Sequence, residues 1–441
     1  MPKTGSDGHK VKKQKISNSK LKATAAKTRK KNVVEGPPSR EAINILLLEN
    51  IHPVAEEAFR ARNLGRLDKH PGSLTEEQLL EVMPNVHILG IRSKTHITKR
   101  VLEASTNLIV LGCFCIGTDQ VDMEAATLSG VAVFNAPFSN TRSVAELTIA
   151  EVIMLARRAA QRSMELHSGR WEKSAKGCME VRRKTIGIIG YGHIGPQVGL
   201  LAESLGMRVV FHDIVKKLPL GNARQVFNLE ELLKISDFVT LHVPDTPLTR
   251  RMINNENLML MPKGSYLLNL SRGSVVDIGA LQNALKRGHL AGAAVDVFPK
   301  EPNSGKDPFT SELRGMDNVI LTPHIGGSTE EAQRNIGLEV SDALLSYVEN
   351  GSSDGCANLP EVHLPAMEDS YRLLNIHTDV PGVLSRINGL IAGMSVNIKA
   401  QSYSTRNGVG YLIMDVERSL SRTIGKQIES LDSNIRTRLL F

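Results

Sequence analysis

The chain has 441 residues, which exceeds one ordinary domain of roughly 100–200 residues and predicts two to four domains. Its hydrophobic fraction of 41% and charged fraction of 23% exclude fibrous and wholly disordered proteins and leave enough apolar material for large cores. The formal net charge is +8, but residues 1–40 hold 12 Lys and Arg against Asp7 and Glu35, a net of +10. The remaining residues therefore hold 42 basic and 44 acidic side chains, a net of −2. The composition predicts a basic tail on a nearly neutral body.

Residues 1–40 are rich in Lys, Ser and Thr and contain no aromatic residue, so they cannot build a core. We expect a solvated, disordered extension. A localisation signal or an arm that binds nucleic acid are the alternatives. An organelle transit peptide is disfavoured because Lys far outnumbers Arg and no amphipathic apolar face is present.

Four cysteines in so long a chain do not form a disulfide framework, and the C-x-C of Cys113 and Cys115 lacks the second pair of a zinc site. We expect no metal and a reducing, cytoplasmic compartment. The longest stretch without a charged residue, Thr185–Ala202, contains five glycines and a proline, which fits a turn better than a membrane span. No signal peptide and no membrane partner are expected.

From Ile43 onward, short apolar runs alternate with helical segments, which indicates parallel α/β sheets. Helical patterns at Ser143 to about Leu166 and at Thr329–Glu349 separate two such series and would join two lobes. After a linker, residues 369–441 have the order β-α-β-β-α-β of a ferredoxin-like domain. The predicted strands are INILLL, VHILGI, LIVLGC and VAVFNA in the first series, and TIGIIG, RVVFHD, DFVTLHV, SYLLNL, LAGAAVDV and NVILTP in the second.

A G-x-G-x-x-G motif at Gly190, Gly192 and Gly195 follows the first strand of the second series and opens a helix. A second strand then ends at Asp213, 18 residues beyond the last glycine. This context is the dinucleotide-binding fingerprint: the first glycine permits the turn, the second admits the pyrophosphate, and the third lets helix and strand approach. Asp213 can accept from both ribose hydroxyls and would repel a 2′-phosphate. NAD is therefore favoured over NADP, although two lysines shortly after Asp213 leave that preference open.

Three functional side chains follow the late strands of this series, at the edge where ligands bind in open α/β sheets. His324 has the ordinary pKa of a general base near neutrality. Glu301 could bind the far nitrogen of that ring, raise its pKa and fix its tautomer, as the acid of a triad does. Arg272 could clamp a substrate carboxylate with two hydrogen bonds. The three together predict oxidation of a 2-hydroxy acid.

The motifs GIIGYGHIG, NLSRGSVVD, DVFPKEP and LTPHIGGSTEEAQRNIGLEV together resemble the D-2-hydroxyacid dehydrogenase family. The motifs GCFCIGTDQVD and NAPFSNTRSVAE narrow the resemblance to its phosphoglycerate dehydrogenase branch, in the short class that ends in one ACT domain. The resemblance covers about residues 43–441. It implies NAD-dependent oxidation of 3-phosphoglycerate to 3-phosphohydroxypyruvate, the first step of L-serine biosynthesis. It also implies a homotetramer, and 2-oxoglutarate reduction as a side activity.

By resemblance, Arg272, Glu301 and His324 occupy catalytic positions, and Arg92 and Ser93 would contact the substrate phosphate. The NAD contacts would come from the glycine motif and from the ends of the strands. They are Gly190, Gly192, His193, Ile194, Gly195, Asp213, Leu270, Ser271, Arg272, Asp296, His324, Ile325, Gly326 and Gly327.

The segment from His377 to Val383 resembles the ACT motif H-x-N-x-P-G-V, with Asn397 in the following strand as a second contact. The resemblance implies feedback inhibition by L-serine, bound where two ACT domains meet. Asp379 stands where that class typically has Asn, and a carboxylate cannot donate to a carboxylate or hydroxyl oxygen. Serine regulation and a purely assembling ACT domain therefore both stay open.

The predicted fold is α/β, with two Rossmann- or flavodoxin-like parallel-sheet lobes and a ferredoxin-like ACT domain. Residues 41–139 with 327–368 would form the substrate-binding lobe and linker, residues 140–326 the NAD-binding domain, and residues 369–441 the regulatory domain. One alternative is a glycerate or hydroxypyruvate reductase of the same family. Another is a non-catalytic NAD-sensing regulator whose tail binds nucleic acid. The complete set of Arg272, Glu301 and His324 argues against the regulator.

Overall fold

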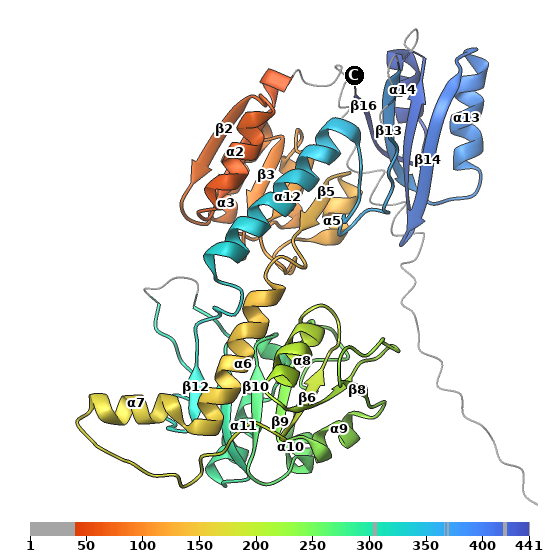
Figure 1. Ribbon diagram of the computed structural model, residues 1–441. Helices are drawn as coiled ribbons and strands as arrows, with labels where there is room; N and C mark the ends of the chain where they lie inside the picture. The colour runs from red at the N-terminus through yellow and green to blue at the C-terminus, as the bar shows by residue number, and fades with distance from the viewer. Residues whose placement is uncertain (1–39, 303–306, 366, 368–369, 418–420, 441) are drawn as a thin grey trace, which may run out of the picture. The chain divides into compact units, whose positions relative to one another are not determined.

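The computed structural model describes residues 40–302, 307–365, 367, 370–417 and 421–440 (Figure 1). The chain divides into two compact units. One unit combines the residues up to Ala136 with those from Gly337 onward, and the other is the continuous segment Pro137–Ile336. The predicted basic tail lies outside the described residues except for Arg40, which begins a short 3-10 helix, η1 (Arg40–Ala42).

The first lobe is a five-stranded parallel sheet in the order β2-β1-β3-β4-β5. Every residue of β3 and β4 is buried, as expected for parallel strands covered on both faces. Gly112 of β4 lets the long helix α12 approach, because an added Cβ would lie 2.7 Å from Val340 and 2.8 Å from Leu344. The elements are β1 (Asn44–Leu48), α2 (Pro53–Ala61), β2 (Arg66–His70), α3 (Glu76–Val82), η2 (Met83–Asn85), β3 (Ile88–Ile91), α4 (Lys99–Ala104), β4 (Val110–Cys113), α5 (Met123–Leu128), β5 (Ala132–Asn135) and α12 (Glu330–Asn350).

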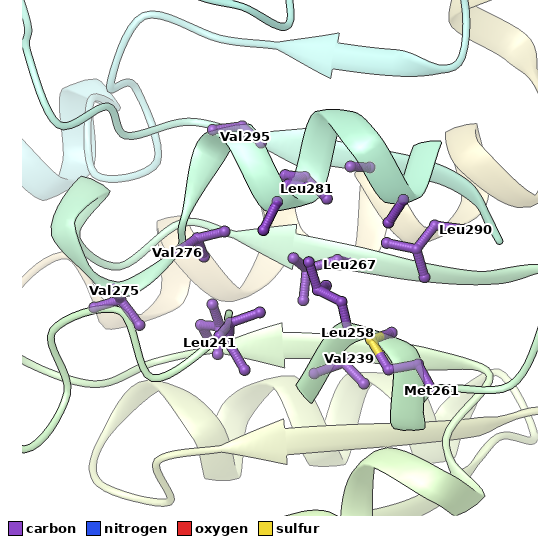
Figure 2. Packing of buried hydrophobic residues seen from close by; sticks show 14 of the residues in the cluster. Val239, Leu241, Leu258, Met261, Leu267, Val275, Val276, Leu281, Leu290 and Val295 are labelled. Atoms are coloured by element: carbon purple, nitrogen blue, oxygen red, sulfur yellow. The ribbon is translucent and has the colours of Figure 1, made fainter. Parts of the chain in front are cut away.

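The second unit contains a seven-stranded parallel sheet in the order β12-β11-β10-β9-β6-β7-β8. The order reverses beside β6, so the strand ends at β6 and β9 form the switch point where dinucleotides bind in such sheets. Figure 2 shows part of the core, where Val239 of β9, Leu267 of β10 and Leu281 of α11 belong to one buried cluster. The elements are α6 (Thr141–Arg157), α7 (Ala159–His167), β6 (Thr185–Ile189), α8 (Ile194–Ser204), β7 (Arg208–His212), β8 (Arg224–Gln225), α9 (Leu229–Ile235), β9 (Phe238–Leu241), α10 (Asn255–Leu260), β10 (Ser265–Asn269), η3 (Gly273–Val275), α11 (Ile278–Lys286), β11 (Leu290–Val295) and β12 (Val319–Leu321).

The long helical stretch expected from Ser143 to Leu166 is two helices. Arg158 adopts a left-handed conformation (φ 53°) that ends α6 and begins α7. Its backbone N–H still caps α6 by donating to the carbonyls of Met154 and Leu155. The stretch contains neither Gly nor Pro at the break, which is why the apolar periodicity alone suggested one helix.

The C-terminal domain is a four-stranded antiparallel sheet in the order β14-β15-β13-β16, with α13 and α14 in the connections. The side chains of Leu373, Ile387, Leu412 and Ile424 belong to its core. The predicted fold class, two parallel-sheet lobes and a β-α-β-β-α-β domain, is confirmed. The elements are β13 (Tyr371–Thr378), α13 (Val383–Gly393), β14 (Ile398–Arg406), β15 (Val409–Val416), α14 (Ser421–Glu429) and β16 (Asn434–Leu440).

Side chains of this C-terminal domain hydrogen-bond to backbone carbonyls of the first lobe, within the same compact unit. The Arg436 guanidinium donates to the carbonyl of Leu108, and the Tyr411 hydroxyl donates to the carbonyl of Gly351 (2.6 Å). Burial lowers the pKa of Arg436 to about 10. Because the Tyr411 side chain is buried and Arg436 is half-buried, these bonds satisfy groups that would be costly to leave unpaired.

Among the described residues, none of the helices has both the length and the apolar character needed to span a bilayer.

Candidate active site

The turn after β10 carries Ser271 and Arg272 and is held by the buried side chain of Asn269. The Asn269 Oδ1 accepts from the backbone N–H (3.1 Å) and the hydroxyl (2.9 Å) of Ser271, and its Nδ2 donates to the carbonyl of Arg272 (3.0 Å). The Arg272 guanidinium also donates to the Ser271 carbonyl (2.8 Å). The turn is therefore pre-organised, with the guanidinium at the carboxyl end of the sheet.

The turn that carries His324 is held by Asp296, which is 1% exposed at the end of β11. The two carboxylate oxygens accept from the N–H groups of Ile325 and Gly326, each at 2.8 Å. The Thr322 hydroxyl donates to the same carboxylate (2.6 Å). His324 itself adopts a left-handed conformation (φ 55°), which a non-glycine residue keeps only where its surroundings impose it.

His324 and Glu301 form the pair that the sequence predicted. The His324 Nδ1 lies 2.9 Å from the Glu301 Oε2, while the Glu301 Oε1 accepts from the N–H of Phe298 (3.1 Å). The hydrogen bond to Glu301 raises the pKa of His324 against the opposing effect of burial. Burial acts to raise the pKa of Glu301, but the bond from His324 and nearby charges outweigh it, so that pKa is lowered. With Nδ1–H donating to a carboxylate, Nε2 is the atom that can accept a proton.

Arg272 lies close enough to this pair for its charge to contribute to the lowered pKa of Glu301 and to oppose the raised pKa of His324. The structure thus brings together a base, the acid that orients it, and a cation. This set can remove a hydroxyl proton from a substrate whose carboxylate is bound by the guanidinium.

The glycine motif has the geometry of a phosphate cradle. An added Cβ at Gly192 would meet no described atom within 4 Å, so the backbone there is open to a ligand. At Gly190 (φ 93°) the Cβ would lie 2.3 Å from the carbonyl oxygen of His242, and at Gly195 it would lie 2.4 Å from that of Gly190. Two glycines are thus required by packing, and the middle one leaves room for a pyrophosphate at the start of α8.

Asp213 lies at the end of β7, and its carboxylate accepts from the N–H groups of Tyr191 (2.9 Å) and Val215 (3.1 Å). Each oxygen retains acceptor capacity for ribose hydroxyls. The residues present therefore fit NAD. Asp213, the open glycine and the N-terminus of α8 would hold its ribose and pyrophosphate.

The side chains of two other predicted cofactor residues, Leu270 and His193, pack against apolar neighbours. Leu270 packs its side chain into the core of the unit. The His193 ring lies against Phe138, with ring centroids 3.9 Å apart. Among the described residues, no group of three or more His, Cys, Asp or Glu side chains is arranged to hold a metal ion.

Arg92 and Ser93 belong to the other unit, where they follow β3 at the carboxyl edge of its sheet. Arg92 is half-buried and Ser93 is exposed. The backbone of this loop is bound by Glu49 and Gln120.

Sequence reasoning missed five residues that hold these turns or lie behind them: Asn269, Thr322, Glu49, Gln120 and Glu151. Asn269 and Thr322 stand at the ends of predicted strands, and that position was the available signal. Glu49 directly follows β1 and offered the same signal. Glu151 gives no signal, because a Glu within an amphipathic helix is normally solvent-exposed.

The ACT-like segment from Asp379 to Val383 lines an open pocket of about 490 Å³ at the N-terminus of α13. Asp379 lines it. His377 is buried behind it, with its ring stacked on Tyr403 (centroids 5.6 Å apart) and its Nδ1 2.7 Å from the Asn375 Oδ1. Burial lowers the pKa of His377 to about 4. Asn397 is exposed and is not part of the pocket lining. The complete lining is Asp379, Val380, Pro381, Gly382, Val383, Leu384, Ser385 and Tyr403.

Comparison with known proteins places these features in a family. Residues 149–326 match the family described as D-isomer specific 2-hydroxyacid dehydrogenase, NAD binding domain, and residues 373–436 match the AHAS small subunit-like ACT domain. The D-3-phosphoglycerate dehydrogenase of Dictyostelium discoideum is 50% identical over 402 residues, 91% of this chain and 98% of the relative. The chain belongs to the D-3-phosphoglycerate dehydrogenase family. That of Escherichia coli K12 is also 50% identical, over 404 residues and the same shares of both chains.

Solved structures agree with this membership. The D-lactate dehydrogenase of Aquifex aeolicus, complexed with NAD and lactic acid, is 27% identical, with a TM-score of 0.63 over 72% of this chain and 100% of that one. The TT0316 protein of Thermus thermophilus is 32% identical, with a TM-score of 0.62 over 69% of this chain and 96% of that one. As a D-3-phosphoglycerate dehydrogenase family member, the protein is an NAD-dependent dehydrogenase. The resemblance, the enzyme class and the NAD cofactor predicted from sequence are confirmed.

Proposed function

We propose that the protein catalyses the NAD-dependent oxidation of 3-phosphoglycerate to 3-phosphohydroxypyruvate, the first step of L-serine biosynthesis. The observation that carries this proposal is the His324–Glu301 pair, 2.9 Å apart, beside Arg272 and in the same unit as the glycine cradle. The choice of substrate is supported by relatives named for it that share half their residues over nearly their whole length.

In the proposed reaction, Arg272 binds the carboxylate of 3-phosphoglycerate, and the Nε2 of His324 accepts the proton of the C2 hydroxyl. Bound NAD supplies the acceptor for the hydride that leaves C2. Glu301 stabilises the imidazolium that forms and keeps the ring in its working tautomer. In the reverse direction, the same imidazolium returns the proton to the ketone oxygen.

The decisive assay measures NADH oxidation with phosphohydroxypyruvate, hydroxypyruvate and 2-oxoglutarate in parallel, with His324→Ala as the control. Phosphohydroxypyruvate should be the best substrate, and 2-oxoglutarate should be a slower one. A preference for hydroxypyruvate would instead favour the alternative, a glycerate or hydroxypyruvate reductase of the same fold.

Arg92 and Ser93 are proposed to contact the substrate phosphate. Arg92→Ala should raise the KM for phosphohydroxypyruvate about 10- to 100-fold, since a charged hydrogen bond contributes about 1.5–3 kcal/mol. The KM for hydroxypyruvate, which lacks the phosphate, should stay nearly constant. An equal loss with both substrates would contradict this assignment.

The four segments are proposed to divide the work as follows. Residues 41–139 and 327–368 bind the substrate, residues 140–326 bind NAD, and residues 369–441 regulate. The ACT pocket is proposed to bind L-serine as a feedback inhibitor, with Asp379 accepting from its ammonium group. Serine should then lower activity, and Asp379→Asn, which adds a donor, should strengthen the inhibition. A flat titration with serine up to high millimolar concentrations would contradict the regulatory role.

The protein is further proposed to act in the cytoplasm as a homotetramer. Large apolar side chains exposed around α7 support association: Met164, Leu166 and Trp171, the last of them 81% exposed.

A further inference from the structure

A buried carboxylate lies beneath the loop that carries Arg92 and Ser93. Glu49 is 8% exposed and follows the last residue of β1. Its Oε1 accepts from the N–H groups of Arg92 (3.2 Å) and Thr95 (2.8 Å), and its Oε2 accepts from the N–H of Lys94 (3.0 Å). One side chain therefore binds three of the four backbone donors between residues 92 and 95.

The backbone around Glu49 is bent in a way that brings its side chain to this loop. Glu49 (φ 61°) and Asn50 (φ 50°) are consecutive residues in the left-handed region, where side chains other than glycine are uncommon. Strand β1 pairs directly with β3, so the residue after β1 and the loop after β3 meet at one edge of the sheet. The unfavourable conformation is thus compensated by contacts to the loop.

A second buried side chain holds the loop from the other side. The Gln120 Nε2 donates to the carbonyl oxygen of Arg92 (2.7 Å), and Gln120 is 6% exposed. The N–H of Arg92 is thereby bound by Glu49 and its carbonyl by Gln120. The side chain of Ser93 remains exposed.

This arrangement has a consequence for anion binding. Successive free N–H groups in a loop can themselves cradle a phosphate. Here Glu49 occupies three of the four, which leaves the N–H of Ser93 and the loop's side chains to bind a phosphate. Those side chains are effective only if the backbone is already fixed, because ordering a loop on binding reduces affinity.

We propose that Glu49 is a positioning residue that fixes the Arg92–Ser93 loop for recognition of the substrate phosphate. This inference rests on the proposed function of that loop. Glu49 acts through Arg92 and Ser93 and does not itself touch the substrate.

The test compares Glu49→Gln and Glu49→Asp with the unaltered full-length enzyme, using phosphohydroxypyruvate and hydroxypyruvate. In Glu49→Gln an amide group replaces one acceptor, so at least one loop N–H loses its partner. The KM for phosphohydroxypyruvate should rise about tenfold, which corresponds to one lost interaction of about 1.4 kcal/mol. The kcat, the KM for hydroxypyruvate and the Kd for NADH should change less than about twofold. Glu49→Asp keeps the charge and should restore part of the loss.

Leu102→Ala is the matched control, because it removes a buried side chain from α4 of the same lobe. It should lower Tm without changing the ratio of the two KM values. If Glu49→Gln behaves like this control, or affects both substrates equally, Glu49 has only a structural role and the inference is wrong.

Arg92→Ala separates this inference from the function on which it rests. If Arg92→Ala shows no selective loss for the phosphorylated substrate, the phosphate assignment itself fails. If it does show that loss, the double variant with Glu49→Gln should lose less than the product of the two single effects, because both changes affect one contact. Independent effects that multiply would overturn the positioning role.

Discussion

His324 has a left-handed backbone conformation, and its ring is hydrogen-bonded to the carboxylate of Glu301. The turn is imposed by Asp296, whose side chain binds the two N–H groups that follow His324. The position of the ring is therefore set by two carboxylates, one through the backbone and one through Nδ1. The Glu301 contact is also the largest cause of the raised pKa of the ring, and the charge of Asp296 acts in the same direction.

We predict that Glu301→Gln shifts the pH profile of substrate oxidation toward lower pH. Oxidation needs neutral His324, so the rate rises as the pH passes the pKa of that ring, which Glu301 raises. Glutamine carries no charge to stabilise the imidazolium, so the midpoint of this rise should fall. A profile of kcat/KM for substrate oxidation against pH measures this midpoint. His324→Ala should lose about 10²- to 10⁴-fold in rate and the associated limb of the profile. An unmoved midpoint in Glu301→Gln would contradict the pairing.

Glu151 of α6 is a buried carboxyl group, only 1% exposed. Neither of its oxygens is hydrogen-bonded to a described residue. Burial raises its pKa to about 8, and the charge of Asp296 acts in the same direction. The side chain is therefore protonated in the folded protein near pH 7.

From the raised pKa of Glu151 we predict how the free energy of unfolding depends on pH. Below pH 4.5, Glu151 is protonated in both folded and unfolded states and has no pH-dependent effect. As the pH rises from 4.5 to about 8, the unfolded state ionises first, so the protein loses stability, by up to several kcal/mol in total. Glu151→Gln should remove this loss, so its Tm should exceed that of the unaltered protein more at pH 8 than at pH 5. A constant difference in Tm would show that the pKa of Glu151 is ordinary.

At the scale of elements, the connection from β6 to α8 carries three glycines with different tasks. Gly195→Ala brings a Cβ within 2.4 Å of a carbonyl oxygen, whereas Gly192→Ala meets no described atom within 4 Å. Packing therefore requires glycine at position 195, whereas at position 192 only a bound ligand would require it.

We predict that the two variants separate stability from cofactor binding. Gly195→Ala should lower Tm by several degrees, because overpacking costs about 1–3 kcal/mol and each kcal/mol moves Tm by about 2–4 °C in a domain of this size. Gly192→Ala should keep the Tm of the apoprotein but raise the Kd for NADH about tenfold or more, measured by titration. If Gly192→Ala binds NADH normally, the open space is not the pyrophosphate site.

The sequence predicts elements well where their pattern is local. The segment from β6 through α8 to β7 follows from an apolar run, three glycines and an acid at fixed spacing. Strand β2, with the polar sequence RLDKH, could not be predicted because it lies at an exposed sheet edge and lacks an apolar pattern. The contacts of Glu49 could not be predicted either, since they join residues 43 to 46 positions apart through the pairing of strands.

At the scale of the whole molecule, the net charge of +8 does not describe the folded part of the enzyme. Residues 1–39 carry 11 Lys and Arg against two acids, so the rest of the chain is close to neutral. Arg40 belongs structurally to the first lobe, because its carbonyl accepts from the N–H of Gly65 (2.9 Å).

We predict that deletion of residues 1–39 leaves kcat/KM within about twofold. The same deletion should abolish retention on a cation exchanger at low salt, because retention depends on the charges of the tail. A severe loss of activity would show that the tail takes part in catalysis.

The unit Pro137–Ile336 is an insertion between two segments that together form the other unit, and this has a consequence for synthesis on the ribosome. Strands β1 to β5 are made before the insertion, but the part of α12 that packs against β4, at Val340 and Leu344, follows the entire insertion. The Asn358 side chain likewise accepts from the N–H of Val133, 225 residues earlier. The inserted unit can fold while the chain is still growing. The first lobe must keep part of its apolar surface uncovered until α12, which ends at Asn350 of the 441 residues, has been made.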